Sequence, residues 1–130
     1  MQTVRTPAVA GLFYPADTAE LHNQVQHFLS QVEPPVEPPP KAIIAPHAGY
    51  VYSGPIAASA YARLKAARGT IARVVLLGPS HRVGFRGVAV SGMVAFETPL
   101  GRIPVDQEAV ELARQLPDVG FLEQAHAQEH

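Results

Sequence analysis

The chain has 130 residues, with 10 Lys and Arg against 11 Asp and Glu, so its formal net charge is −1. This balance excludes a strongly basic nucleic-acid binder, and a hydrophobic content of 47% excludes a disordered chain. The absence of cysteine excludes a disulfide scaffold and a thiolate-ligated zinc finger within these residues. No run approaches the roughly 18 apolar residues of a membrane span, and no apolar segment of a signal peptide is present. We therefore expect a single cytoplasmic domain.

The first third of the chain predicts a helix and a connector. Asp17 followed by Glu20 has the spacing of a capping box, and apolar residues then recur at helical spacing, which predicts a helix over about 18–32. Residues 33–40 (EPPVEPPP) predict an extended, polyproline-like segment. A plain connector and a PxxP ligand both fit this segment, and the apolar run that follows favours the connector.

The middle of the chain predicts a parallel βαβ unit. Residues 41–45 (KAIIA) and 72–77 (ARVVLL) are short apolar runs typical of strands buried on both faces. Between them, Ser53 is the expected N-cap of a helix over about 56–67, and Gly69 is its expected stop. Strand, helix and strand with short connections indicate an α/β fold.

The last third predicts two further strands and a helix. Residues 87–91 and the stretch around Phe96 have strand character, and 98–101 (TPLG) predicts a turn. Asp106 is the expected cap of a helix that runs to about Leu116. The buried positions expected in that helix are Val110, Leu112 and Ala113.

Two histidines follow the ends of the predicted parallel strands. His47 comes directly after 41–45, and His81 comes shortly after 72–77. Neighbouring parallel strands lie about 4.8 Å apart and place the loops after their carboxyl ends at one sheet edge, where ligands bind. Two imidazoles there could reach one metal ion, although each could equally hydrogen-bond a loop carbonyl. The residues alone predict a metal or polar-substrate site at this edge.

Several residues accompany this pair as candidates. Glu97 and Asp106 are carboxylates suggested only by elimination, since neither has a recognisable metal-ligand spacing. Three further residues lie beside the histidines, where they could donate hydrogen bonds to a site or simply pack: Tyr50, Tyr52 and Ser80.

The end of the chain offers a separate metal hypothesis. Residues 126–130 (HAQEH) match the H-x-x-E-H pattern of one class of zinc peptidase. That chemistry requires both histidines to lie one turn apart on a stable helix, with the Glu activating water. The match is short and ends on its second histidine, so it ranks below the His47 and His81 pair.

Four motifs, in this order, resemble the Memo family, whose microbial members are called AmmeMemoRadiSam system protein B. They are TPAVAGLFYP at 6–15, PHAGYVYSG at 46–54, LLGPSH at 76–81 and TPLG at 98–101. The terminal Glu129-His130 resembles the start of the family's next motif, Glu-His-Ser-hydrophobic-Glu. The resemblance covers essentially the whole chain and implies one Memo-like domain over 1–130, truncated at its C-terminal side.

The resemblance also implies a fold and a metal. The fold is a three-layer α/β/α sandwich similar to the class III extradiol dioxygenases that use non-haem iron, here incomplete. The family's pocket binds iron or copper through two histidines, which map onto His47 and His81, and a cysteine from the family's second half. Arg82 stands where the family commonly has a second histidine. Lacking the cysteine, this chain is expected to be inactive alone.

Two functions follow from the sequence. The first is a metal-binding redox or dioxygenase-like domain, with an AMMECR-type protein and a radical-SAM protein as partners implied by family association. The alternative is a non-catalytic module that recognises a peptide or protein. Neither involves nucleic acid or a membrane.

Overall fold

The computed structural model describes residues 4–130, which form two compact units in a mixed α/β chain. Residues 10–74 make up the helical unit, and residues 4–9 together with 75–130 make up the sheet unit. The helical unit contains α1 (Thr18–Ser30), α2 (Tyr50–Tyr61) and the 3-10 helix η1 (Ala62–Ala67). Within residues 4–130, no helix combines the length and apolar character that a bilayer crossing requires.

Helix α1 begins where the sequence predicts. The Asp17 carboxylate accepts a hydrogen bond from the Glu20 N–H at 2.9 Å, which satisfies one of the unpaired donors of the first turn. Leu21, on the apolar stripe, is buried with 3% of its surface exposed. The helix ends at Ser30, with Gln31 as its C-cap, two residues before the predicted end.

Helix α2 begins earlier than predicted, and Ser53 is not its cap. Gly49 is the N-cap, and the Tyr50 N–H donates to the carbonyl of Phe13 at 2.8 Å. The Ser53 hydroxyl instead donates to the Ala48 carbonyl at 2.8 Å from within the helix. The prediction was wrong because Pro55 resembles a first-turn proline, whereas it lies inside the helix and simply lacks one N–H.

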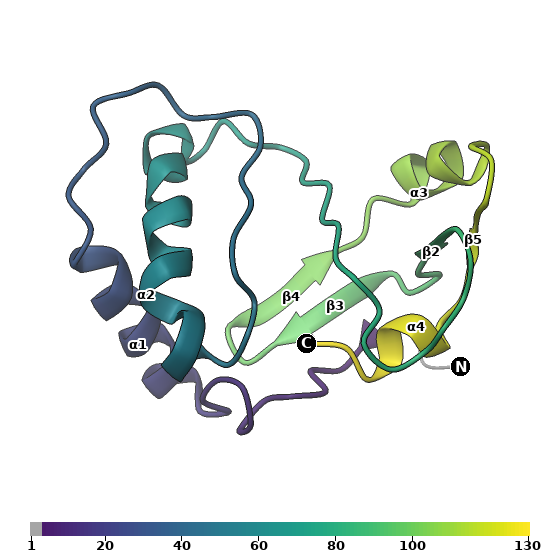
Figure 1. Cartoon of the computed structure of the whole chain (residues 1–130), viewed down its shortest axis with the longest axis horizontal. Coiled ribbons are helices and arrows are strands. Elements are labelled where there is room, and N and C mark those ends of the chain that lie inside the picture. The colour runs from purple at the N-terminus through teal and green to yellow at the C-terminus, as the bar shows by residue number, and fades with distance from the viewer. Residues whose placement is uncertain (1–3) are drawn as a thin grey trace. The chain divides into compact units, whose positions relative to one another are not determined.

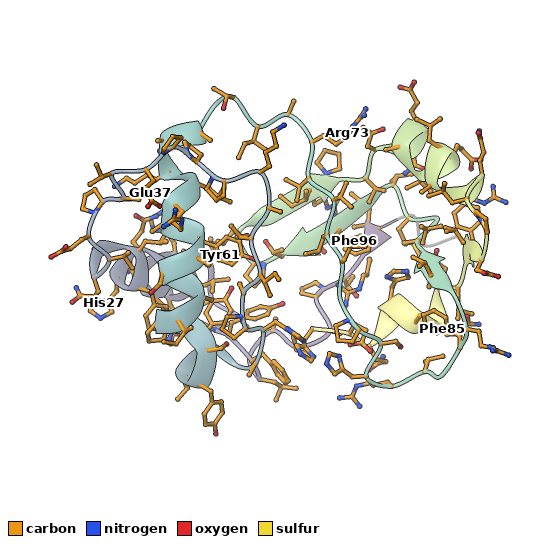
Figure 2. The ribbon with its side chains drawn as sticks, turned by 45° about the horizontal axis from the view of Figure 1, so that its top comes forward. His27, Glu37, Tyr61, Arg73, Phe85 and Phe96 are labelled. Atoms are coloured by element: carbon orange, nitrogen blue, oxygen red, sulfur yellow. The ribbon has the colours of Figure 1, made fainter. Side chains whose placement is uncertain are left out.

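Helices α1 and α2 pack side by side in the helical unit (Figure 1). The close approach depends on Gly54 of α2, which faces the ring of Phe28 on α1. The connector after α1 is tied to η1 by an ion pair between Glu37 (labelled in Figure 2) and Arg63. This pair lowers the pKa of Glu37 through the Arg63 hydrogen bond and charge, but its exposure leaves little net stabilisation.

The sheet unit contains a three-stranded sheet in the order β1-β3-β4. Strand β1 (Val4–Arg5) pairs in parallel with β3 (Ala95–Thr98), which forms an antiparallel hairpin with β4 (Gly101–Pro104). Figure 1 shows the hairpin as two adjacent arrows. The Thr98 hydroxyl accepts from the Leu100 N–H at 3.1 Å within the turn, which confirms the predicted turn.

A second, parallel pair joins β2 (Val88–Val90) to β5 (Val119–Phe121), with Val88 opposite Val119. Helix α3 (Gln107–Arg114) precedes β5 and has the predicted cap, because the Asp106 carboxylate accepts from the Ala109 N–H at 3.0 Å. Helix α4 (Gln124–Ala127), which the sequence did not predict, follows β5. Leu112 of α3, expected to be buried, is 56% exposed.

The predicted βαβ unit does not form. Residues 41–45 and 72–77 adopt no regular structure, and most of their apolar side chains are exposed, with Ile44 at 100% and Leu76 at 82%, while Ile43 is half-buried. An apolar run is stable as a strand only when neighbouring strands pair with it and helices cover both its faces. No described strand pairs with either segment, so their composition is not sufficient to make them strands.

Candidate metal centre

The loop after residue 77 and the end of the chain meet at His81. The Nδ1 atom of His81 lies 2.6 Å from Oε2 of Glu129, and its backbone N–H donates to Oε1 of the same carboxylate at 2.5 Å. The Arg82 N–H adds a third hydrogen bond to Oε1 at 3.2 Å. The carboxylate of Glu129 therefore joins two segments that are 48 residues apart in sequence.

His130 brings a second imidazole to the same place. Its ring stacks on that of His81 with centroids 4.4 Å apart and an interplanar angle of 30°. A potential ligand nitrogen of each ring lies within 4.8 Å of the other. Two nitrogens on one ion, each bound at about 2.1 Å, are separated by roughly 3–4 Å, so small ring movements suffice. Imidazole suits iron, copper and zinc, and these residues therefore fit a transition metal.

The tail that carries Glu129 and His130 is held by Arg5 of β1. The Arg5 Nε donates to the His126 carbonyl at 2.7 Å, and a terminal guanidinium nitrogen donates to the Glu129 carbonyl. The same guanidinium lies 5.1 Å from the ring centroid of Phe96 on β3, which is labelled in Figure 2. Arg5 thereby fixes the backbone from which Glu129 reaches His81.

The Glu129 carboxyl is ionised at neutral pH. Burial by itself raises its pKa, but the side-chain and backbone hydrogen bonds from His81, the His81 charge and the Arg82 N–H together lower it below the usual value. The Glu129 side chain is 15% exposed and the His81 side chain is 39% exposed, so the contact lies at the surface and remains open to water. The His81 ring is thus held beside a negative charge.

The family model described as "Memo-like protein" matches residues 5–130. The chain belongs to the Memo family. It is 42% identical over 127 residues to a MEMO1 family protein of Aquifex aeolicus, covering 98% of this chain and 46% of that protein. A MEMO1 family protein of Methanocaldococcus jannaschii is 40% identical over 140 residues, covering all of this chain and 48% of the relative. The chain spans about half the length of the curated relatives it matches.

His47 of this Memo-family chain lies exposed in the loop before α2, within the helical unit, whereas His81 lies in the sheet unit. Their pairing stays a prediction. The Tyr50 ring packs against Tyr14, with centroids 5.5 Å apart, and burial raises the pKa of its hydroxyl. Tyr52 is 83% exposed.

Ser80 and the two carboxylates suggested by elimination all have local partners in the Memo-family chain. The Ser80 hydroxyl donates to the Val83 carbonyl at 2.7 Å and shapes the loop that carries His81. Glu97 accepts from Arg102 at 2.9 Å across the β3–β4 hairpin, and Asp106 caps α3. These contacts give each residue a role in the fold.

The zinc-peptidase hypothesis for residues 126–130 is wrong for this structure. Helix α4 ends at Ala127, so Glu129 and His130 lie beyond it and the two histidines do not share a helix. The ring of His126 instead packs edge-on against the ring of Phe96, with the ring centroids 6.2 Å apart. Sequence reasoning missed the contact of Glu129 with His81, and the available signal was the resemblance of Glu129-His130 to the start of a family motif.

Proposed function

We propose that this Memo-family chain binds a redox-active metal ion, iron or copper, through the imidazoles of His81 and His130. The observation that carries the proposal is the stacked ring pair with the Glu129 carboxylate on Nδ1 of His81. Because that nitrogen is engaged, His81 would bind the ion through Nε2. A bound ion would supply Lewis-acid and one-electron chemistry.

His47 is proposed as a further ligand. Its support is the family motif at 46–54, in which the resemblance makes this histidine a ligand together with His81. These 130 residues contain no cysteine, so they do not themselves supply a thiolate ligand. Imidazoles with a carboxylate behind them are the donors this chain offers, and they suit iron and copper.

The wider fold and activity are proposals for the whole protein. A three-layer α/β/α sandwich similar to the class III extradiol dioxygenases, and dioxygenase-like redox chemistry, rest on the family resemblance. The exposed apolar segments at 41–45 and 72–77 support such a sandwich, because their composition suits strands covered on both faces.

Metal titration tests the proposed site. We expect the chain to bind Fe(II) under anaerobic conditions and Cu(II) in air, at one ion per chain. Removing an imidazole ligand should weaken binding by at least about tenfold, so His81→Ala and His130→Ala should show the largest losses and His47→Ala a clear one. Isothermal titration calorimetry against each metal measures these effects.

His22→Ala is the matched control, because this histidine is exposed on α1 of the helical unit. Its removal should leave the affinity unchanged and thereby correct for non-specific binding by surface imidazoles. Equal affinity of the wild-type chain, His81→Ala and His47→Ala would show that the site is assigned wrongly.

The second candidate function is a protein-binding module. The segment before His81 favours it, because Val75, Leu76 and Leu77 are each at least 80% exposed in a continuous apolar run. The partners we propose are an AMMECR-type protein and a radical-SAM protein, by family association. Such an interaction would use apolar burial and need no metal.

Direct binding separates the two functions. We expect the purified chain to bind a purified AMMECR-type protein from the same genome equally well with and without EDTA. A charge in the apolar run, Leu76→Asp, should weaken that binding at least tenfold, because it buries an unpaired carboxylate in the interface. Analytical ultracentrifugation measures complex formation, and no complex with the wild-type chain would exclude this partner.

A further inference from the structure

Glu129 contacts His81 through both of its carboxylate oxygens. One oxygen lies 2.6 Å from the ring Nδ1, and the other accepts the His81 backbone N–H at 2.5 Å. An ionised carboxylate has no proton to donate, so Nδ1 must carry the proton of this hydrogen bond. In the neutral ring, Nε2 is then the unprotonated nitrogen.

We infer that Glu129 is a positioning residue that fixes His81 as the Nδ1–H tautomer and directs Nε2 toward a metal ion. This inference rests on the proposed function. Histidine ligands of metals commonly donate their second ring N–H to a carboxylate or carbonyl, which sets the tautomer, orients the ring and makes the ligand nitrogen more basic.

The surroundings of Glu129 suit positioning. Its side chain is 15% exposed, and it contacts a His81 side chain that is 39% exposed. Its backbone is fixed by the Arg5 guanidinium, which donates to the Glu129 carbonyl. The contact with the backbone of His81 fixes the ring relative to its own loop, so the carboxylate determines both rotation and protonation of the ring.

A purely structural role for Glu129 would be to fasten the tail to the loop. That role predicts a change in the order of the tail without a change in which His81 nitrogen carries the proton. Positioning predicts that Glu129→Ala converts the single tautomer into a mixture. It also predicts that Glu129→Gln favours the Nε2–H tautomer, because the single amide oxygen is needed by the backbone N–H groups of His81 and Arg82 and the amide NH2 is left to donate to Nδ1.

Two-bond ¹⁵N–¹H correlation spectra of the histidine-labelled full chain without metal report the tautomer directly. We compare the wild type, Glu129→Ala, Glu129→Gln and the exposed control Glu33→Ala. Metal affinity is measured in parallel by titration with Fe(II) and Cu(II). We expect Glu129→Ala and Glu129→Gln each to weaken binding by roughly 10- to 100-fold, and Glu33→Ala not at all.

The two readouts separate this inference from the proposed function. If the tautomer changes in Glu129→Ala but the wild type binds no metal, the proposed metal site is rejected. Glu129 would then still set the tautomer of His81, but it would not position a metal ligand. Metal binding by the wild type with neither tautomer nor affinity changed in Glu129→Ala would overturn the inference alone. If Glu129→Ala fails to fold, an unchanged His81 tautomer together with an unchanged metal affinity in folded Glu129→Gln would equally overturn it.

Discussion

Replacing Gly87 with Ala is expected to destabilise the β2–β5 pair by about 3–4 kcal/mol. Gly87 has a φ of +86°, which costs an L-residue roughly 1–2 kcal/mol. An added Cβ would also lie 2.2 Å from the Asp118 carbonyl oxygen. That oxygen accepts the Val88 N–H at 2.8 Å, so relieving the clash breaks a hydrogen bond that joins the strands.

Gly69→Ala is the matched control for this substitution. Gly69 has nearly the same φ, +83°, but an added Cβ would meet nothing within 4 Å. Its cost should therefore be the backbone term alone. Amide hydrogen exchange at Val88 for Gly87→Ala, and at Ala62 for Gly69→Ala, measures each opening free energy. We expect roughly 100- to 1,000-fold lost protection in the first case and about tenfold in the second. Equal losses would show that the Asp118 contact is unimportant.

Gly54→Ala is expected to destabilise the packing of α1 on α2. Alanine in a helix gains about 1 kcal/mol over glycine, which favours the substitution. The new Cβ, however, would lie 2.5 Å and 2.8 Å from ring atoms of Phe28, and overpacking of this kind costs about 1–3 kcal/mol. We expect a net loss of up to about 2 kcal/mol in urea unfolding followed by circular dichroism.

A double-mutant cycle with Phe28→Ala isolates the cause. With the ring removed, only the helical preference of alanine remains, so Gly54→Ala should become stabilising by up to about 1 kcal/mol. The difference between the two backgrounds corresponds to a coupling of about 1–3 kcal/mol. Additive effects of the two substitutions would contradict direct contact between Gly54 and Phe28.

Local signals in the sequence predicted the structure wherever neighbouring residues decide it. The Asp17 and Asp106 caps, the Thr98–Gly101 turn and the Gly69 stop each depend on contacts within about four residues, and all are present. Pro55 misled the prediction of α2 because the position of a proline in a helix depends on where the helix begins. Here the Phe13 carbonyl, far away in sequence, receives the first N–H.

The apolar runs at 41–45 and 72–77 show the limit of composition. Burial on both faces is a property of what surrounds a strand, and in this structure Ile44 and residues 72–77 are exposed. The two parallel pairs among the described strands, β1 with β3 and β2 with β5, join segments far apart in sequence, whereas the β3–β4 hairpin is local. The pairing of these parallel strands therefore cannot be predicted from local periodicity.

The sequence by itself determined the family, the local caps and turns, and His81 as a candidate ligand. Only the tertiary structure decided that Glu129 and His130 lie against His81, because that contact joins segments 48 residues apart through the docking of the tail on Arg5. Because these residues include no cysteine, imidazole and carboxylate groups are the metal donors that they offer. Long-range packing decides which of these donors lie close together, because the sequence does not specify the distances between side chains that are far apart along the chain.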